Sequence, residues 1–253
     1  MKKAMVVFAS AIWLGTCAAQ AELIAHWKLD GNLGNAIGEK FELKTSGWSE
    51  PVYSDDARGG GQSVHFGNPP AGGPNTVTDR LWASGGTDLG MGSGSWSFAA
   101  WIKPDEDVLS GAMTIFSAEG TDTKYKLYCD IREKNTMDLF FKNDSNPSLV
   151  PDKMVSGFWA HSGNWSLLAV VFDSTAGTIS IYRYSDETSP KDIQAEGVVL
   201  RKQMNSKFDI TIKSFSLGYS AGNKNGFSGL MDDVRIYNHA LSEQEIVGLV
   251  EGK

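Results

Sequence analysis

Residues 226–246 read Gly-Phe-Ser-Gly-Leu-Met-Asp-Asp-Val-Arg-Ile-Tyr-Asn-His-Ala-Leu-Ser-Glu-Gln-Glu-Ile. Within this stretch, residues 234–237 alternate apolar and polar side chains, which is the period of a strand with one buried face. Asp232 shares the parity of Val234 and Ile236, so the alternation predicts that its carboxylate points toward the apolar side. A buried carboxylate without a partner is costly. Asp232 is therefore expected to meet either a set of backbone amides or a cation.

The second half of the same stretch predicts a helix start. Ser242 and Glu245 have the spacing of a capping box, and Leu241 and Ile246 occupy the two positions of a hydrophobic staple. We therefore expect one short helix over residues 242–250, and the rest of the sequence predicts no other.

Elsewhere the chain consists of short strand-like runs separated by turn residues, which is typical of a two-sheet antiparallel β-sandwich or jelly roll. A long loop is expected over residues 67–95, which are rich in Gly, Pro, Asn and Asp, and loops of that length are often functional. The predicted strands cover residues 23–32, 62–66, 95–104, 113–117, 124–131, 137–142, 165–173, 177–182, 198–201 and 210–217.

The N-terminus has the pattern of a secretory signal peptide. Lys2 and Lys3 precede an apolar run over residues 4–14, and Ala19-Gln20-Ala21 matches a cleavage site. The run is shorter than the roughly 20 apolar residues of a membrane span. The sequence thus predicts a signal peptide over residues 1–21, cleavage after Ala21, a single domain over residues 22–253, and a secreted or periplasmic location.

The composition agrees with one exported, acidic β domain. The formal net charge is −7, and it becomes −9 without Lys2 and Lys3. This balance argues against nucleic acid and anionic membranes as partners, because both attract basic surfaces. Cys129 is the only cysteine beyond the signal peptide, so no internal disulfide is expected.

Four segments together resemble laminin-G-like domains of the concanavalin A-like lectin/glucanase superfamily. They are Leu-Ile-Ala-His-Trp-Lys-Leu-Asp-Gly-Asn at 23–32, Ser-Trp-Ser-Phe-Ala-Ala-Trp-Ile-Lys-Pro at 95–104, Trp-Ser-Leu-Leu-Ala-Val-Val-Phe-Asp at 165–173, and the opening stretch. They occur in the order found in that family. The resemblance implies the concanavalin A-like form of the β-sandwich over most of the chain.

The resemblance also implies a structural Ca²⁺ where the first strand ends and the last strand begins. Matched residue by residue, its ligands would be Asp30, the Gly31 carbonyl and Asp232. Ca²⁺ needs six to eight oxygens, so further carbonyls and water would complete the shell. The alternative is that Asp232 caps backbone amides and Asp30 caps a turn.

A lectin-like site would place a sugar face on an exposed aromatic ring beside polar side chains. Of the seven tryptophans beyond the signal peptide, three lie outside the predicted strands: Trp48, Trp82 and Trp159. Trp82 stands beside Arg80 and Asp79 in the predicted loop, so these three residues are the candidate ligand-binding residues. The alternative for Trp82 is that it covers the core beneath its own loop.

Catalysis is not expected. Glucanases of this superfamily carry two catalytic carboxylates, usually in a Glu-x-Asp-x-Glu string on one strand, and no such string occurs in this sequence. The function predicted is a non-catalytic module that binds an extracellular polysaccharide or a glycoprotein glycan. The alternative is a structural or adhesive protein that binds another protein, and a glycoside hydrolase or polysaccharide lyase is the third hypothesis.

Overall fold

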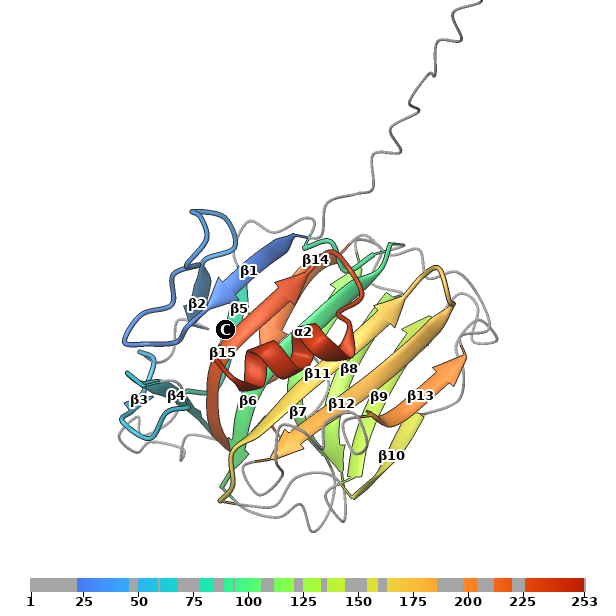
Figure 1. Ribbon diagram of the computed structural model, residues 1–253. Helices are drawn as coiled ribbons and strands as arrows, with labels where there is room; N and C mark the ends of the chain where they lie inside the picture. The colour runs from blue at the N-terminus through green and yellow to red at the C-terminus, as the bar shows by residue number, and fades with distance from the viewer. Residues whose placement is uncertain are drawn as a thin grey trace, which may run out of the picture.

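The computed structural model places two antiparallel β-sheets face to face, with one short helix on the outside (Figure 1). This is the all-β sandwich that the sequence predicts. The structure describes residues 22–45, 50–58, 60–67, 78–83, 89–92, 94–105, 112–120, 125–132, 136–143, 154–158, 163–185, 198–203, 212–219 and 226–252. The predicted signal peptide, residues 1–21, lies outside these ranges.

The front sheet, nearest the viewer in Figure 1, has eight strands in the described part of the chain. The last strand in sequence, β15, lies between β6 and the pair β4 and β1. The strand order is β13 (Val198–Gln203), β12 (Thr178–Ser185), β11 (Ser166–Asp173), β6 (Trp96–Pro104), β15 (Gly229–Tyr237), β4 (Ser63–Phe66) and β3 (Tyr53–Ser54), and β1 (Leu23–Trp27) pairs with β15.

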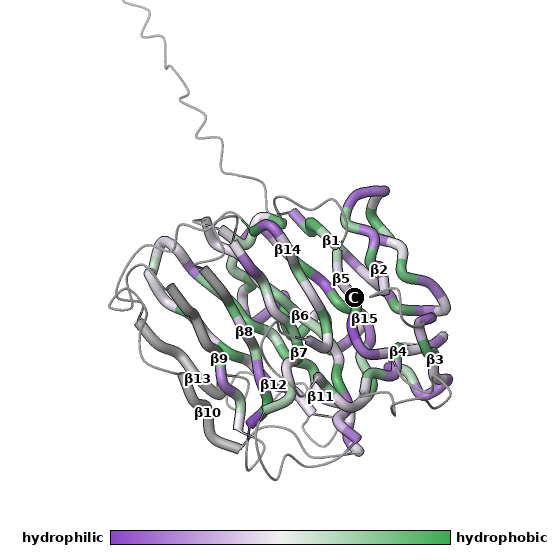
Figure 2. The backbone as a smooth tube through the Cα atoms, turned by 180° about the vertical axis from the view of Figure 1, so that it is seen from behind, coloured by the Kyte–Doolittle hydropathy of each residue, from purple (hydrophilic) through white to green (hydrophobic). Residues whose placement is uncertain are grey.

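The back sheet has seven strands in the described part. Its order is β10 (Met154–Phe158), β9 (Thr136–Asn143), β8 (Tyr125–Arg132), β7 (Ala112–Gly120), β14 (Ile212–Leu217), β5 (Leu81–Ala83) and β2 (Leu43–Thr45). Figure 2 shows this sheet from its outer side, where hydrophilic and hydrophobic residues alternate along β14. One face of the sheet is therefore built to meet solvent.

The core fills the space between the sheets with large side chains from both. The rings of Phe98 in β6 and Phe116 in β7 have centroids 4.2 Å apart, and those of Trp27 in β1 and Phe215 in β14 stack at 5.8 Å. All four side chains are fully buried. Such contacts tie the two sheets together, because packed aromatic pairs contribute roughly 0.5–1.5 kcal/mol beyond their buried area.

Helix α2 (Glu243–Val250) covers part of the outer face of the front sheet. Ser242 is its N-cap, and the capping box with Glu245 is formed as predicted. Leu241 and Ile246 are both buried in an apolar cluster that includes Trp101 of β6. This cluster gives the amphipathic helix a surface on which to pack.

The predicted loop over residues 67–95 was wrong in its middle. Residues 81–83 form β5, which lies between β14 and β2 and pairs with both. Thr78 bridges to Phe66 just before it. Three other strands escaped prediction, β2, β3 and β10, and two of them have only two or three residues. Strands this short lack the alternation from which a strand can be recognised.

Candidate functional site

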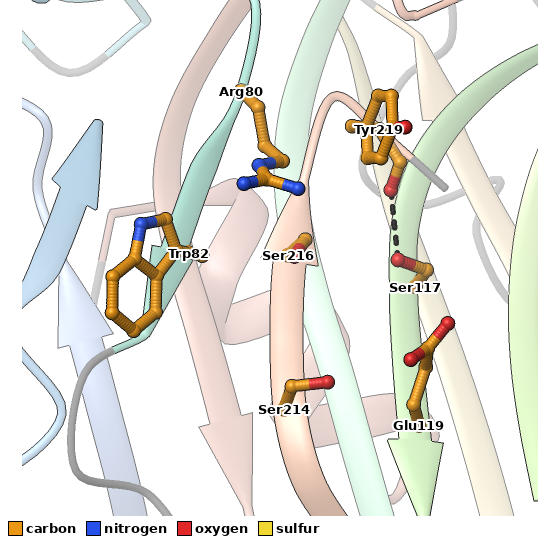
Figure 3. A pocket seen from close by; sticks show the side chains of 7 residues that line it. All are labelled: Arg80, Trp82, Ser117, Glu119, Ser214, Ser216 and Tyr219. Atoms are coloured by element: carbon orange, nitrogen blue, oxygen red, sulfur yellow. Dashed lines mark hydrogen bonds between the residues drawn. The ribbon is translucent and has the colours of Figure 1, made fainter. Parts of the chain in front are cut away.

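A pocket of about 180 Å³ opens on the outer face of the back sheet, over β5, β14 and β7 (Figure 3). It is smaller than the roughly 300–1,000 Å³ of pockets that enclose a whole small molecule. It therefore suits one part of a longer ligand. Its lining residues are Arg80, Trp82, Ser117, Glu119, Ser214, Ser216 and Tyr219.

The sheet register brings the centre of the pocket together. Trp82 in β5 pairs with Ser216 in β14, which pairs on its other side with Ser117 in β7. Residues opposite one another in antiparallel strands point to the same face. Leu81 and Leu217, one position along, are fully buried in the core. Trp82, Ser216 and Ser117 therefore form a row across three strands on the outer face.

The indole of Trp82 is held in place from its polar side. Its Nε1 donates a hydrogen bond to the backbone oxygen of Thr45 in β2, at 3.0 Å. The ring is half-buried and belongs to neither apolar cluster. It does not cover the core, as one alternative held, but presents an anchored aromatic surface at the pocket.

Arg80 lies two residues before Trp82 and so shares its face of the sheet. Its guanidinium carbon lies 5.0 Å from the centroid of the Tyr219 ring. Its Nε is buried and has no hydrogen-bond partner within the described ranges. The side chain is therefore positioned by an aromatic contact while a buried donor remains unpaired.

Tyr219 reaches the pocket because β14 ends in a sharp turn. Gly218 has a φ of +75°, and a Cβ atom there would overlap the buried ring of Phe66. Ser117 then fixes the segment that follows, by donating from Oγ to the backbone oxygen of Tyr219 at 2.7 Å. Glycine is thus required at 218 both for the backbone conformation and for space.

The arrangement provides an aromatic surface with hydrogen-bonding groups around it. The hydroxyls of Ser214 and Ser216 and the Arg80 guanidinium can donate to ligand oxygens. Glu119 can accept from ligand hydroxyls, and so can the Ser117 hydroxyl, whose own hydrogen is donated to Tyr219. Among the residues that the structure describes, Glu119 is the only carboxylate that lines the pocket. Hydrolysis of a glycosidic bond normally uses two carboxylates. These groups are suited to binding a polyhydroxylated ligand.

One pair of carboxylates does lie on the outer side of the back sheet. Asp130 in β8 and Asp138 in β9 are opposite each other in register. They are 3 % and 0 % exposed, and Arg132 forms ion pairs with both, at 3.4 and 2.8 Å. Neither carboxylate is accessible to a polysaccharide, so the pair holds strands together.

Two of the three predicted ligand-binding residues, Trp82 and Arg80, meet in this pocket, whereas Asp79 is not among its lining residues. Trp48 and Trp159 lie outside the described ranges. The other lining residues were missed. The alternating Ser214 and Ser216 in β14 were the available signal. Only the register shows that they share a face with Trp82.

The predicted calcium ligands Asp30 and Asp232 also lie near one another, close to Arg58 and to residues 61–62. The backbone N–H of Gln62 donates to Asp30 at 2.7 Å, and that of Arg58 donates to Asp232 at 2.8 Å. A Cβ atom on Gly61 would overlap the Asp30 carboxylate. The loop thus approaches both carboxylates closely, and each one caps a backbone amide.

Burial raises the pKa of Asp232 to about 6, and the neighbouring charges of Asp233 and Asp30 add to this effect. A divalent cation would relieve that repulsion, so the site fits Ca²⁺ in charge. The site has few ligand atoms for Ca²⁺, since no group of three or more His, Cys, Asp or Glu side chains that could hold a metal occurs in the described residues. Asp233 is already bound to His26 and Arg235, at 2.5 and 2.9 Å.

The predicted orientation of Asp232 was wrong in one respect. Its side chain is buried, with 4 % exposed. However, it pairs with Trp101, which belongs to the outer cluster beneath α2 and not to the core. A bulge between Asp232 and Arg235, with Asp233 at a φ of +50°, shifts the alternation by one residue. Asp232 therefore lies on the opposite face from Val234.

No helix in the described residues is long and apolar enough to cross a membrane. None of the curated protein sequences matches this chain. A laminin G family model, described as the concanavalin A-like lectin/glucanases superfamily, matches residues 58–247.

Several solved structures share the fold. Domain 4 of AbnA, an extracellular arabinanase from Geobacillus stearothermophilus, in complex with arabinotriose, is 20 % identical with a TM-score of 0.62, over 91 % of this chain and 98 % of that one. The binding domain of botulinum neurotoxin DC in complex with SialylT is 11 % identical with a TM-score of 0.62. The same toxin domain in complex with rat synaptotagmin II is 10 % identical with a TM-score of 0.64. Both toxin matches cover 91 % of this chain and 51 % of the other, so this chain corresponds to about half of those domains.

Proposed function

We propose that this chain, which belongs to the laminin G-like branch of the concanavalin A-like lectin/glucanase superfamily, is a non-catalytic module that binds carbohydrate. The observation that carries the proposal is the anchored Trp82 ring beside Arg80, Tyr219 and three serines on an open sheet face. Aromatic rings pack against the apolar face of a sugar, and the surrounding polar groups bind its hydroxyls. Two structures of the same fold that hold glycans, arabinotriose and SialylT, give further support.

The test is binding to a glycan array that covers plant, algal and animal polysaccharides, followed by titration calorimetry with the best ligand. Trp82→Ala should weaken binding by about tenfold or more, because a stacked aromatic ring contributes on the order of 1–3 kcal/mol. Ile37→Ala is the matched control, since Ile37 is a large apolar residue that is 47 % exposed and lies outside the pocket. It should bind as the wild type does.

Absence of detectable binding to every glycan on the array would contradict this proposal. Co-purification with an envelope or matrix protein would then favour the structural or adhesive alternative. Equal loss of binding in both variants would also contradict it, because the pocket would not be the binding site.

Export is part of the proposal, and it rests on the sequence of residues 1–21. Expression in a bacterial host that processes signal peptides should yield a protein that begins at Glu22. Intact mass measurement of the exported protein decides this. Recovery of a chain that still begins at Met1, confined to the cytoplasm, would contradict it.

We include a structural Ca²⁺ held by Asp30, the Gly31 carbonyl and Asp232 in this proposal. Ca²⁺ at a hundredfold excess over its Kd should then stabilise the folded state by about 2.7 kcal/mol. Asp232→Asn keeps an acceptor for the Arg58 N–H but removes the charge. This variant should not respond to Ca²⁺, and in chelator it should be at least as stable as the wild type.

A wild-type melting temperature that is unchanged by Ca²⁺ and by chelator, in protein shown to be metal-free, would exclude the metal. Asp30 and Asp232 would then act only as caps for backbone amides.

A further inference from the structure

Arg80 is the one positively charged side chain among the described residues that line the pocket. Within the described part of the chain, its guanidinium forms no hydrogen bond or ion pair, and its contact is the Tyr219 ring. A buried donor that lacks a partner is unfavourable in the free protein. A ligand that supplies an acceptor at this point would remove that cost.

The pocket is also polarised along the strands. Arg80 and Tyr219 lie at one end, near the end of β14, and Glu119 lies at the other, where it pairs with Ser214 (Figure 3). Four residues along β14 separate the two ends, or roughly 13 Å at the rise of a strand. An anionic group is therefore attracted at the Arg80 end and repelled at the Glu119 end.

Guanidinium is the side chain best matched to a carboxylate. Its planar fork donates two parallel hydrogen bonds to the two oxygens, whereas a single sugar hydroxyl uses only one of them. Contact with Tyr219 fixes the plane of the fork before the ligand arrives, so little side-chain freedom is lost on binding. Trp82, two residues along the same face, is placed to contact the ring that carries the carboxylate.

We propose that the pocket recognises an acidic sugar, with its carboxylate on Arg80, its ring on Trp82 and its hydroxyls toward the serines and Glu119. This inference rests on the proposed carbohydrate-binding function and makes it more specific. Uronic acids are the chemical class that fits, because they combine a carboxylate with a pyranose ring.

The experiment compares oligosaccharides of galacturonic, glucuronic and mannuronic acid with their carboxyl-reduced counterparts by titration calorimetry. Wild-type protein should bind at least one acidic form about tenfold more tightly than its reduced counterpart, the loss expected when a charged hydrogen-bonded pair is removed. Arg80→Gln should weaken binding of the acidic form far more than binding of the reduced form, so that the preference is lost. Arg80→Lys should restore only part of it, because lysine keeps the charge but lacks the fork.

Lys44→Gln is the matched control. Lys44 is exposed on β2, pairs with Trp82 in register, and does not line the pocket. It removes the same charge from the same face of the sheet. The preference for the acidic form should persist in this variant.

Three outcomes would overturn the inference. They are equal affinity of the wild type for acidic and reduced forms, equal loss of preference in Lys44→Gln and Arg80→Gln, and tighter binding to a sulfated neutral oligosaccharide than to any uronate. In each of these cases carbohydrate binding itself stands. If neither the array nor this panel gives any ligand, the proposed function fails as well.

Discussion

Gly218 links the fold of the back sheet to its pocket, because it turns the chain outward so that Tyr219 can contact Arg80. We predict that Gly218→Ala lowers the free energy of unfolding by about 2–4 kcal/mol. The added Cβ would overlap the Phe66 ring and would force alanine into a conformation with a φ of +75°. Urea denaturation measures this change. Gly38→Ala is the control, because a Cβ there meets nothing within 4 Å, and its effect should be small. Equal effects at the two positions would contradict the prediction.

Asp56 fastens the loop between β3 and β4 to the front sheet. It accepts hydrogen bonds from Lys103 at 2.6 Å and from Trp165 Nε1 at 2.9 Å, and these lower the pKa of its carboxyl. Because the folded pKa is depressed, the stabilisation is present at neutral pH and is lost as pH falls below about 4. The carboxylate is partly exposed, so Asp56→Asn should lower the free energy of unfolding at pH 7 by only about 0.5–1.5 kcal/mol.

The destabilisation by Asp56→Asn should shrink as the pH is lowered, since the wild type then loses the same charge. Urea denaturation at a series of pH values measures this. Glu39→Gln, an equal change of charge at an exposed position, is the control. A difference between Asp56→Asn and the wild type that stays constant with pH would contradict the assignment.

Asp232 shows where residue-level prediction succeeds and where it stops. From the sequence we correctly predicted that the Asp232 carboxylate is buried and that backbone amides are one of its two possible kinds of partner. We predicted the wrong face for that carboxylate, because the bulge at Asp233 leaves no mark in a pattern of apolar and polar residues. A bulge depends on the register with the neighbouring strand, and here that neighbour is β6, about 130 residues earlier in the chain.

Helix α2 tests how much a cap contributes when the helix also packs on a sheet. The Ser242 hydroxyl accepts a hydrogen bond from the Glu245 N–H at 3.3 Å, and the Ser242 N–H donates one to the Glu245 carboxylate at 2.7 Å. Ser242→Ala should lower the free energy of unfolding by about 1 kcal/mol. Gln244→Ala, at an exposed position in the same turn, should cost much less. Thermal unfolding of the two variants side by side decides this, and a Ser242→Ala variant as stable as Gln244→Ala would contradict it.

Among the elements, the longer strands and α2 could be predicted because each carries its own alternation or caps. β5 could not. Its three residues are too few to show a period, and they lie in a stretch rich in Gly and Pro. The same limitation applied to the pocket. Trp82 and Arg80 were found as neighbours in sequence, whereas Ser117, Ser216 and Tyr219 reach them only through the pairing of β5 with β14 and of β14 with β7.

For the molecule as a whole, Cys129 offers a probe of global stability. It is fully buried between the sheets, and burial raises the pKa of its thiol well above the ordinary value. In native buffer it should resist alkylation, because reaction requires both exposure and the thiolate. The labelling rate should follow the urea unfolding curve, measured in a Cys17→Ser variant so that Cys129 is the only thiol. Rapid labelling of the native protein would show that β8 opens locally.

The position of β15 in the front sheet has a consequence for how the chain is made. β1 begins at Leu23 and pairs with β15, which begins at Gly229. The first strand to be synthesised therefore cannot form its pairing in the sheet until the last strand has been synthesised. β6 and β4 also lack one neighbour until then. Folding during translation can therefore produce parts of the back sheet but cannot close the sandwich, and most of the ordering comes at the end of synthesis. Nascent chains arrested before residue 229 should remain open to proteases, whereas full-length chains should become resistant in one step.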